Sequence, residues 1–368
     1  MTSTEAQAQR LKFRDSASMR EAFAATPTRP VLTHLNADTT WLLQLPRPTG
    51  EQDEGGVRRR RSYYNILIDP WLSGPQSDLA SWFSTQWLVT PPAVTTIAEL
   101  ECVLRELERD PDDPGATNEA SPSFIDAVAI SHEFTDHCHE ATLRQLDAAV
   151  PVLATDKAAE LIRGWKHFDT VVTTPAFSGD EGRGQGWRDV LGVAPLPDWL
   201  GIGRVTTKGN ALYYHSALII AFDPRPPPSS ADASAPEAVL YSPHGIQPDD
   251  LVSVAGAGIR TLALLHGLHD VRIWLTKQLN LGALNGLRAV RTTGARYWVA
   301  THDEIKKGGG FIAPLLRRTK WTVRDAVEGE DKKMREREKE SRKEGEEVGG
   351  LGDYNFVELG SGEGLILI

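Results

Sequence analysis

The chain has 368 residues, 40% of them hydrophobic, so it can bury a large core and is not a disordered protein. Its 50 Asp and Glu residues outnumber 40 Lys and Arg, and the net charge of -10 argues against a broad nucleic-acid-binding surface. The first residues contain no apolar signal segment, and the longest apolar runs have only the length of a strand. We therefore expect a cytoplasmic protein with neither a membrane nor a nucleic-acid partner.

The N-terminal half predicts alternating strands and helices after an N-terminal extension over residues 1–29. Apolar runs at 31–45 and 63–70 predict strands, and a helix is expected over 95–110, where Thr96 and Glu99 have capping-box spacing. The strand predicted at 124–131 leads into a polar loop, SHEFTDHCHE. Helices at 141–149 and 155–165, alternating with strands at 151–155 and 170–174, then indicate parallel β-structure.

The C-terminal half repeats this alternation. Strands are expected near 204–209, 212–222, 238–243, 261–265 and 295–303, and the chain ends in β-structure at 354–368. Helices are expected over 248–258, 281–294 and 311–327. Two halves with their helices outside predict one α/β domain over residues 30–368, a four-layer αββα sandwich. Three polar or charged segments, 47–61, 224–237 and 328–350, are expected to be exposed insertions.

Most of the ten histidines fall at or near the ends of predicted strands. Loops at strand ends are where α/β architectures place reactive groups, so several of these side chains could meet at one site. Imidazole nitrogens and carboxylates are common ligands of zinc. The histidines concerned are His132, His137, His139, His215, His244, His266, His269 and His302, whereas His34 and His167 are expected to be structural.

Two segments resemble the metallo-β-lactamase-fold metallohydrolases. In that family a strand ending in Asp-Pro, as in NILIDPWLSGP (65–75), is followed by a strand that feeds the metal loop HxHxDH, as in IDAVAISHEFTDHCHEATLRQLD (125–147). The motif positions fall on His132, Phe134, Asp136 and His137, so that a phenylalanine replaces the second histidine. The resemblance also implies that Asp69 supports the loop. A similarly altered pattern is found in a branch from fungi, plants and cyanobacteria.

The remaining positions of the family pattern are also altered. His244 of LYSPHG stands where the family has an aspartate that bridges two metals, and His302 of VATHDE matches the final histidine. His215 is the nearest candidate for the remaining one. The resemblance thus implies one metal ion held by Asp136, His137, His302 and His244. These ligands suit zinc, and also iron or manganese.

The predicted function is hydrolysis of a small ester, lactone, amide or phosphoester by a metal-activated water, with Asp136 and His132 as catalytic residues. Further candidates for the site are His139, His215 and Asp303. Two alternatives remain open: a metal-free member of the fold that binds a ligand, and an oxidoreductase with non-haem iron. The oligomeric state is also open.

Several other side chains allow two interpretations. Lys306 and Lys307 could contact an anionic substrate or lie in a solvated loop. Trp71, Trp82 and Trp87 could form a pocket wall or pack in the core, and Cys138 could be reactive or a bystander, whereas Cys102 is expected to be a bystander.

Overall fold

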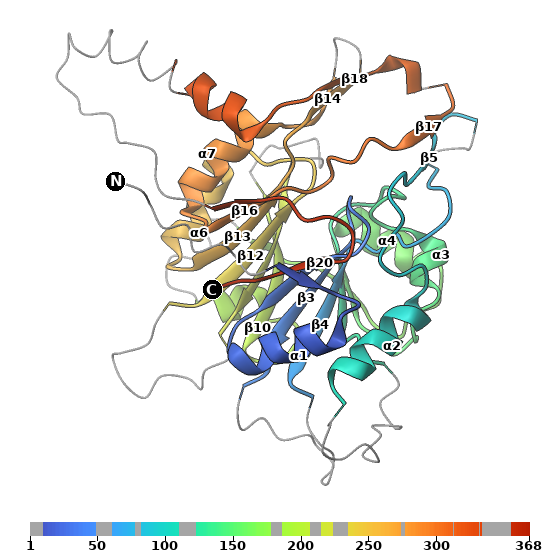
Figure 1. The fold of residues 1–368 in the computed structure, drawn as a ribbon, viewed down its shortest axis with the longest axis vertical. Helices are drawn as coiled ribbons and strands as arrows, with labels where there is room; N and C mark the ends of the chain where they lie inside the picture. The colour runs from blue at the N-terminus through green and yellow to red at the C-terminus, as the bar shows by residue number, and fades with distance from the viewer. Residues whose placement is uncertain are drawn as a thin grey trace, which may run out of the picture.

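Two large β-sheets form the centre of the molecule (Figure 1). The computed structural model describes residues 10–48, 61–77, 82–109, 123–177, 186–206, 215–223, 235–273, 277–311, 313–330, 332 and 355–368. The first sheet has eight strands in the order β1-β20-β2-β3-β4-β6-β7-β8, and the second has seven in the order β19-β16-β13-β12-β11-β10-β9. A three-stranded sheet, β15-β14-β18, and a pair, β17-β5, lie above them in Figure 1.

The strands of the first sheet are β1 (Arg10–Lys12), β2 (Val31–His34), β3 (Trp41–Pro46), β4 (Tyr63–Ile68), β6 (Ala127–Ile130), β7 (Val152–Ala154), β8 (Val171–Thr173) and β20 (Glu363–Ile366). Those of the second are β9 (Ala176–Phe177), β10 (Leu200–Val205), β11 (Ala217–Phe222), β12 (Glu237–Ser242), β13 (Arg260–His266), β16 (Tyr297–Val299) and β19 (Asn355–Val357). The small sheets contain β5 (Thr85–Trp87), β14 (Asp270–Ile273), β15 (Lys277–Asn280), β17 (Lys307–Gly309) and β18 (Leu316–Thr319).

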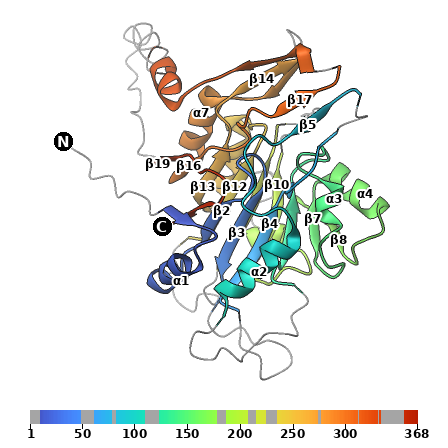
Figure 2. The ribbon, with the colours of Figure 1, turned by 45° about the vertical axis from the view of Figure 1, so that its right-hand side comes forward.

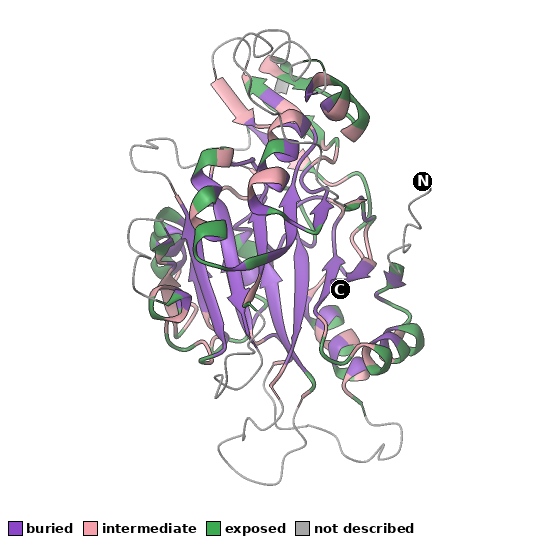
Figure 3. Cartoon of the chain, turned by 90° about the vertical axis from the view of Figure 1, so that its left-hand side faces the viewer, coloured by how far each residue is buried: buried purple, intermediate pink, exposed green. Residues whose placement is uncertain are grey.

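The helices in the described part of the chain include α1 (Ser16–Ala25), α2 (Ile97–Leu107), α3 (Glu140–Leu143), α4 (Asp156–Gly164), α5 (Trp187–Leu191), α6 (Val252–Gly256), α7 (Ala283–Thr293), η1 (Pro248–Leu251) and η2 (Ala313–Leu315). In Figure 2, α2, α3 and α4 lie on one side of the strands and α7 on the other. The central strands are buried almost throughout, while the helices expose one face (Figure 3).

Three separate apolar clusters establish the layer order. In β3, Leu42 packs with the helices α1, α2 and α4, whereas its neighbours Trp41 and Leu43 point the other way, toward the second sheet. The cluster between the sheets takes side chains from both, such as Ile66 of β4 and Ile220 of β11. The third cluster joins the far face of the second sheet to α5, α6 and α7. Alternation along each strand therefore buries both faces of both sheets, which confirms the predicted αββα sandwich.

Parallel pairing brings the functional loops to one edge. β4, β6 and β7 are mutually parallel in the first sheet, and β12, β13 and β16 are parallel in the second. The carboxyl ends of parallel strands lie at the same edge of a sheet. The loops that follow these strands therefore meet where the two sheets face each other.

Two parts of the chain differ from expectation. Residues 10–25 fall in the predicted N-terminal extension, yet β1 pairs with β20, and Phe13 and Met19 are buried in the first core cluster. The helix predicted over 311–327 is wrong in its first part, because β18 pairs with β14 there. Helical structure begins after Thr322, whose side chain accepts a hydrogen bond from the Asp325 backbone at 3.1 Å.

The predicted insertions fall mostly on residues 49–60, 224–234 and 333–354, which lie outside the described part of the chain. Among the helices that are described, none is long and apolar enough to cross a membrane.

Candidate metal centre

The loop after β6 is anchored by Asp69, which follows β4. The Asp69 carboxylate accepts a hydrogen bond from the Ser131 backbone N–H at 2.7 Å, another from the Ser131 hydroxyl, and a third from His137 Nδ1 at 2.6 Å. Asp69 and His137 are both fully buried. A carboxylate behind an imidazole fixes its tautomer and orientation, which is the usual arrangement for a histidine that binds a metal.

His137 faces His244 across the edge between the sheets. Its Nε2 lies 3.0 Å from Nε2 of His244. His137 Nδ1 donates to Asp69, and His244 Nδ1 faces the Asn280 side-chain oxygen at 3.2 Å, so each Nε2 is left with a lone pair. Two nitrogens bound to one tetrahedral zinc ion at roughly 2.0–2.1 Å lie about 3.3 Å apart. The donor set and its spacing therefore fit a shared metal ion.

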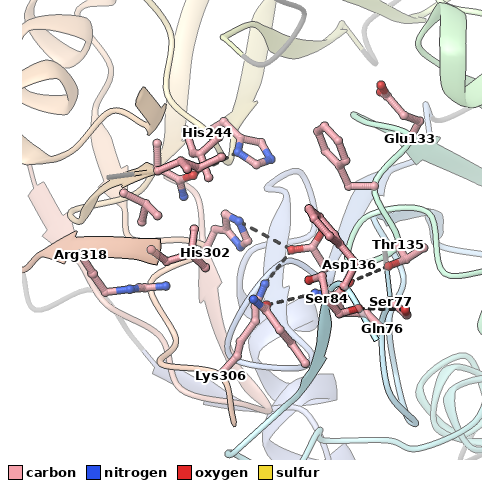
Figure 4. A pocket seen from close by; sticks show the side chains of 18 residues that line it. Gln76, Ser77, Ser84, Glu133, Thr135, Asp136, His244, His302, Lys306 and Arg318 are labelled. Atoms are coloured by element: carbon pink, nitrogen blue, oxygen red, sulfur yellow. Dashed lines mark hydrogen bonds and ion pairs between the residues drawn. The ribbon is translucent and has the colours of Figure 1, made fainter. Parts of the chain in front are cut away.

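Asp136 and His302 form a second cluster beside His137. Asp136 Oδ1 lies 3.6 Å from His137 Nε2, and Asp136 Oδ2 lies 3.8 Å from His302 Nε2. The other ring nitrogen of His302, Nδ1, contacts Asp38 Oδ1 at 3.1 Å. Figure 4 shows Asp136 between His302 and Lys306, whose Nζ donates to Asp136 Oδ2 at 2.6 Å.

Two triads could hold a metal ion, and they share His137. In each, the candidate ligand atoms lie within 4.8 Å of one another. One triad is His132, His137 and His244, and the other is Asp136, His137 and His302.

Burial and neighbouring charges set the protonation of these groups. Burial lowers the pKa of His244, and the nearby His132 and His137 lower it further, so that its imidazole is neutral and able to bind metal. Burial raises the pKa of Asp136, but Lys306, His137 and His302 outweigh burial and hold the pKa well below its usual value. For His137, burial is opposed by Asp136 and Asp69, which raise the pKa above its usual value.

A pocket of about 670 Å³ opens onto the cluster (Figure 4). Asp136, His244, His302 and Lys306 lie on its polar side. Its apolar lining consists of Phe83, Phe134, Val271, Ile273, Leu279 and Leu316. Four of these residues come from β14, β15 and β18, so the three-stranded sheet supplies one wall.

Several solved structures resemble the chain at low sequence identity. No model of a protein family matches the chain, and neither does any curated protein. An isothiocyanate hydrolase from Delia radicum gut bacteria is 14% identical, with 91% of this chain and 98% of that one covered and a TM-score of 0.47. The metallo-β-lactamase fold protein YhfI from Bacillus subtilis is 13% identical, with 92% and 99% covered and a TM-score of 0.43.

CmlA, a diiron β-hydroxylase from Streptomyces venezuelae, is 14% identical, with 75% of this chain and 45% of that chain covered and a TM-score of 0.42. Because the sequence identities and TM-scores are this low, these proteins do not indicate the activity of this chain. The fold rests instead on the two facing sheets, their outer helices and the His/Asp cluster at their common edge. The chain has the metallo-β-lactamase fold.

Within that fold, the altered HxHxDH loop keeps His132, Asp136 and His137 together, while Phe134 packs beside them. The Phe134 ring stacks on His132 at a centroid distance of 6.0 Å, and its carbonyl accepts hydrogen bonds from the backbones of His137 and Cys138. Phe134 therefore packs against the ring of a candidate ligand.

Three further candidates point to other partners. His139 contacts the Thr142 hydroxyl at 2.8 Å and the Pro75 carbonyl at 3.4 Å. The Asp303 carboxylate accepts backbone hydrogen bonds from Leu268 and His269, and burial raises its pKa to about 7. Neither residue belongs to the two triads.

His215 lies behind the cluster. Its Nδ1 contacts the His244 backbone carbonyl at 3.1 Å, so His215 supports the chain that carries His244 and is in neither triad.

The structure adds Asp38 to the site and gives Lys306 an interior position. The solvated-loop interpretation of Lys306 is wrong, because its side chain is only 7% exposed and is paired with Asp38 Oδ2 at 2.8 Å. Lys306 also lines the pocket, so contact with an anionic substrate stays a prediction. The sequence signal for Asp38 was the polar run Asn36–Thr40 between two apolar strands. There the Asn36 side chain accepts hydrogen bonds from the backbones of Asp38 and Thr40, which fixes the turn.

Proposed function

We propose that the chain is a metal-dependent hydrolase of a small molecule and that zinc is its metal. The observation that carries the proposal is the facing pair of imidazole nitrogens on His137 and His244, 3.0 Å apart, with Asp69 behind the first. A bound divalent ion would supply a water of lowered pKa and would polarise a carbonyl or phosphoryl oxygen.

The surrounding residues have separate tasks in this proposal. His137 and His244 bind the ion, Asp69 holds the His137 ring in place, and Asp136 accepts the proton that the attacking water loses. Asp136 is placed for this because it borders the pocket and its Oδ1 lies 3.6 Å from His137 Nε2.

The pocket favours a substrate with an apolar portion. Val271, Ile273, Leu279 and Leu316 form one continuous wall, with Ile273 directly opposite Leu316 in the β14–β18 pairing. Burial of an apolar group against such a wall contributes roughly 25 cal/mol per Å². Esters, lactones, amides and phosphoesters that carry an alkyl or aryl group are therefore the substrates to test.

The experiment combines metal analysis with a substrate panel. Purified protein is expected to contain zinc and to hydrolyse at least one substrate class; a chelator should abolish the activity and added zinc should restore it. His137→Ala should lose both zinc and activity. His167→Ala is the matched control, because its ring contacts the Leu146 carbonyl at 3.0 Å, packs on Phe168 and belongs to neither triad.

A chain that takes up no metal from excess zinc would contradict the proposal. It would favour the alternative of a metal-free ligand-binding protein in the same pocket.

A further inference from the structure

Lys306 occupies the position between two buried carboxylates. Its Nζ lies 2.6 Å from Asp136 Oδ2 and 2.8 Å from Asp38 Oδ2. The same two aspartates contact the two ring nitrogens of His302, at 3.8 Å and 3.1 Å. The ammonium group therefore binds the carboxylate oxygen of Asp136 that faces the Asp136–His137–His302 triad.

The surroundings hold Lys306 in this place. Its Nζ lies 5.4 Å from the centre of the Trp71 ring, which is itself fully buried, in the range of a cation–π contact. The Lys306 side chain is 7% exposed, and Asp38 is fully buried. A buried ammonium with two carboxylates and an aromatic face is a structural cation, because leaving that environment would strand two buried negative charges.

We propose that the Lys306 ammonium takes the place of a metal ion at the Asp136–His137–His302 triad, so that the chain binds a single metal ion, on His132, His137 and His244. The inference rests on the proposed function only in requiring that the site binds metal. It differs from the sequence prediction, in which Asp136 and His302 were ligands of that one ion.

The charges of the buried cluster agree with this assignment. Three buried carboxylates, those of Asp38, Asp69 and Asp136, face one ammonium, that of Lys306. Two negative charges are left over, and one divalent ion balances them. A second divalent ion beside Lys306 would leave two uncompensated positive charges in a buried site, which is strongly unfavourable.

The His132–His137–His244 triad can bind a metal ion without Asp136. His132 Nδ1 contacts the Ser131 hydroxyl at 2.9 Å, and that hydroxyl donates in turn to Asp69. The His132 and His244 rings are 4.6 Å apart, and the His137 and His244 rings 4.9 Å apart. Three imidazoles supported in this way form a ligand set typical of zinc.

The test is zinc stoichiometry and affinity, measured by mass spectrometry and calorimetry on the full chain. The unaltered protein should bind one ion. His132→Ala should weaken binding by more than about ten-fold, a loss typical of a disrupted metal site, whereas His302→Ala should keep the ion. His137 Nε2 can bind only one ion at a time, so Lys306→Met should still bind one, but Lys306→Met with His132→Ala should regain the ion on Asp136, His137 and His302. Lys307→Met with His132→Ala, at the exposed neighbouring lysine, is the matched control and should not regain the ion.

Three results would overturn the inference and leave metal dependence standing: two ions in the unaltered chain, one ion lost in His302→Ala but kept in His132→Ala, or no ion regained in folded Lys306→Met with His132→Ala. A chain without any metal would overturn the proposed function as well. If Lys306→Met does not fold, the comparison of His132→Ala with His302→Ala still shows which of the two triads binds the ion.

Discussion

Backbone strain marks the candidate metal centre at the scale of single residues. Asp69 and His302 both adopt left-handed conformations, with φ of 43° and 57°. Such conformations cost about 1–3 kcal/mol in residues other than glycine and persist where surrounding contacts hold them. Here the His302 N–H donates to the Asp38 carbonyl at 2.9 Å, and the Asp69 N–H to the Ala129 carbonyl at 3.1 Å. These hydrogen bonds therefore hold both residues in their strained conformations at the cluster.

The two cysteines should differ sharply in reactivity. Cys138 is 1% exposed, and burial together with the nearby Asp69 raises the pKa of its thiol, whereas Cys102 of α2 is exposed. Because the thiolate is the reactive form, we expect an alkylating reagent to modify Cys102 alone in the native protein and both cysteines in denaturant. Peptide mapping by mass spectrometry measures this.

Cys102→Ser serves as the control and should leave the native protein unreactive. Modification of Cys138 without denaturant would show that the loop after β6 opens in solution.

At the scale of elements, α7 lies unusually close to the second sheet. A Cβ added at Gly286 would lie 2.6 Å from Cζ2 of Trp298 and 2.9 Å from Nδ1 of His266, closer than real contacts allow. Both neighbours are fully buried. The glycine therefore sets the distance between the helix and strands β13 and β16.

Gly286→Ala should lower the free energy of unfolding by about 1–3 kcal/mol, because the cost of overpacking exceeds the gain in helix propensity. Urea denaturation measures the change. Gly256→Ala, in α6, is the matched control: no atom lies within 4 Å of the added Cβ, so stability should stay the same or rise slightly. Equal stability of the two variants would mean that α7 can move away from the sheet without cost.

For the whole molecule, the candidate ligands come from both sheets. His132 and His137 follow β6 of the first sheet, and His244 follows β12 of the second. An ion shared by these residues would link the two sheets, and its binding free energy would add to the stability of the fold.

We expect removal of the ion by a chelator to lower the melting temperature, since an ion at 100 times its dissociation constant contributes about 2.7 kcal/mol. His137→Ala and His244→Ala should each cause a similar drop. The double variant should cost little more than either, because both act through one ion. Calorimetry of the four proteins, with and without chelator, measures this.

His34→Ala is the control. Its ring is stacked on Trp41 at 3.8 Å within the core, so the variant should be less stable but should keep the ion, and its effect should add to that of His137→Ala. Additive losses for His137→Ala and His244→Ala, with metal retained in both single variants, would contradict a shared ion.

Local features were predictable from the sequence because they depend on near neighbours. The helix predicted over 95–110 is confirmed as α2: Thr96 caps the Glu99 N–H at 3.1 Å, and Leu100, Leu104 and Leu107 are buried. The polar loop that follows the buried strand β6 could also be predicted from the sequence, because its residues are consecutive. The helix predicted over 311–327 was wrong in its first part because pairing of β18 with the distant β14 overrode local helix propensity.

Only the tertiary structure decided which charges meet in the site. Asp38 contacts His302 across 264 residues, and Lys306 contacts Asp136 across 170. No local pattern encodes such pairs, because they arise when two separately built sheets pack face to face. The sequence by itself determined the αββα class and the loop with His132, Asp136 and His137. Whether Lys306 is solvated or buried depended on Asp38, Asp136 and Trp71 converging around it, which only the packing of the two sheets could bring about.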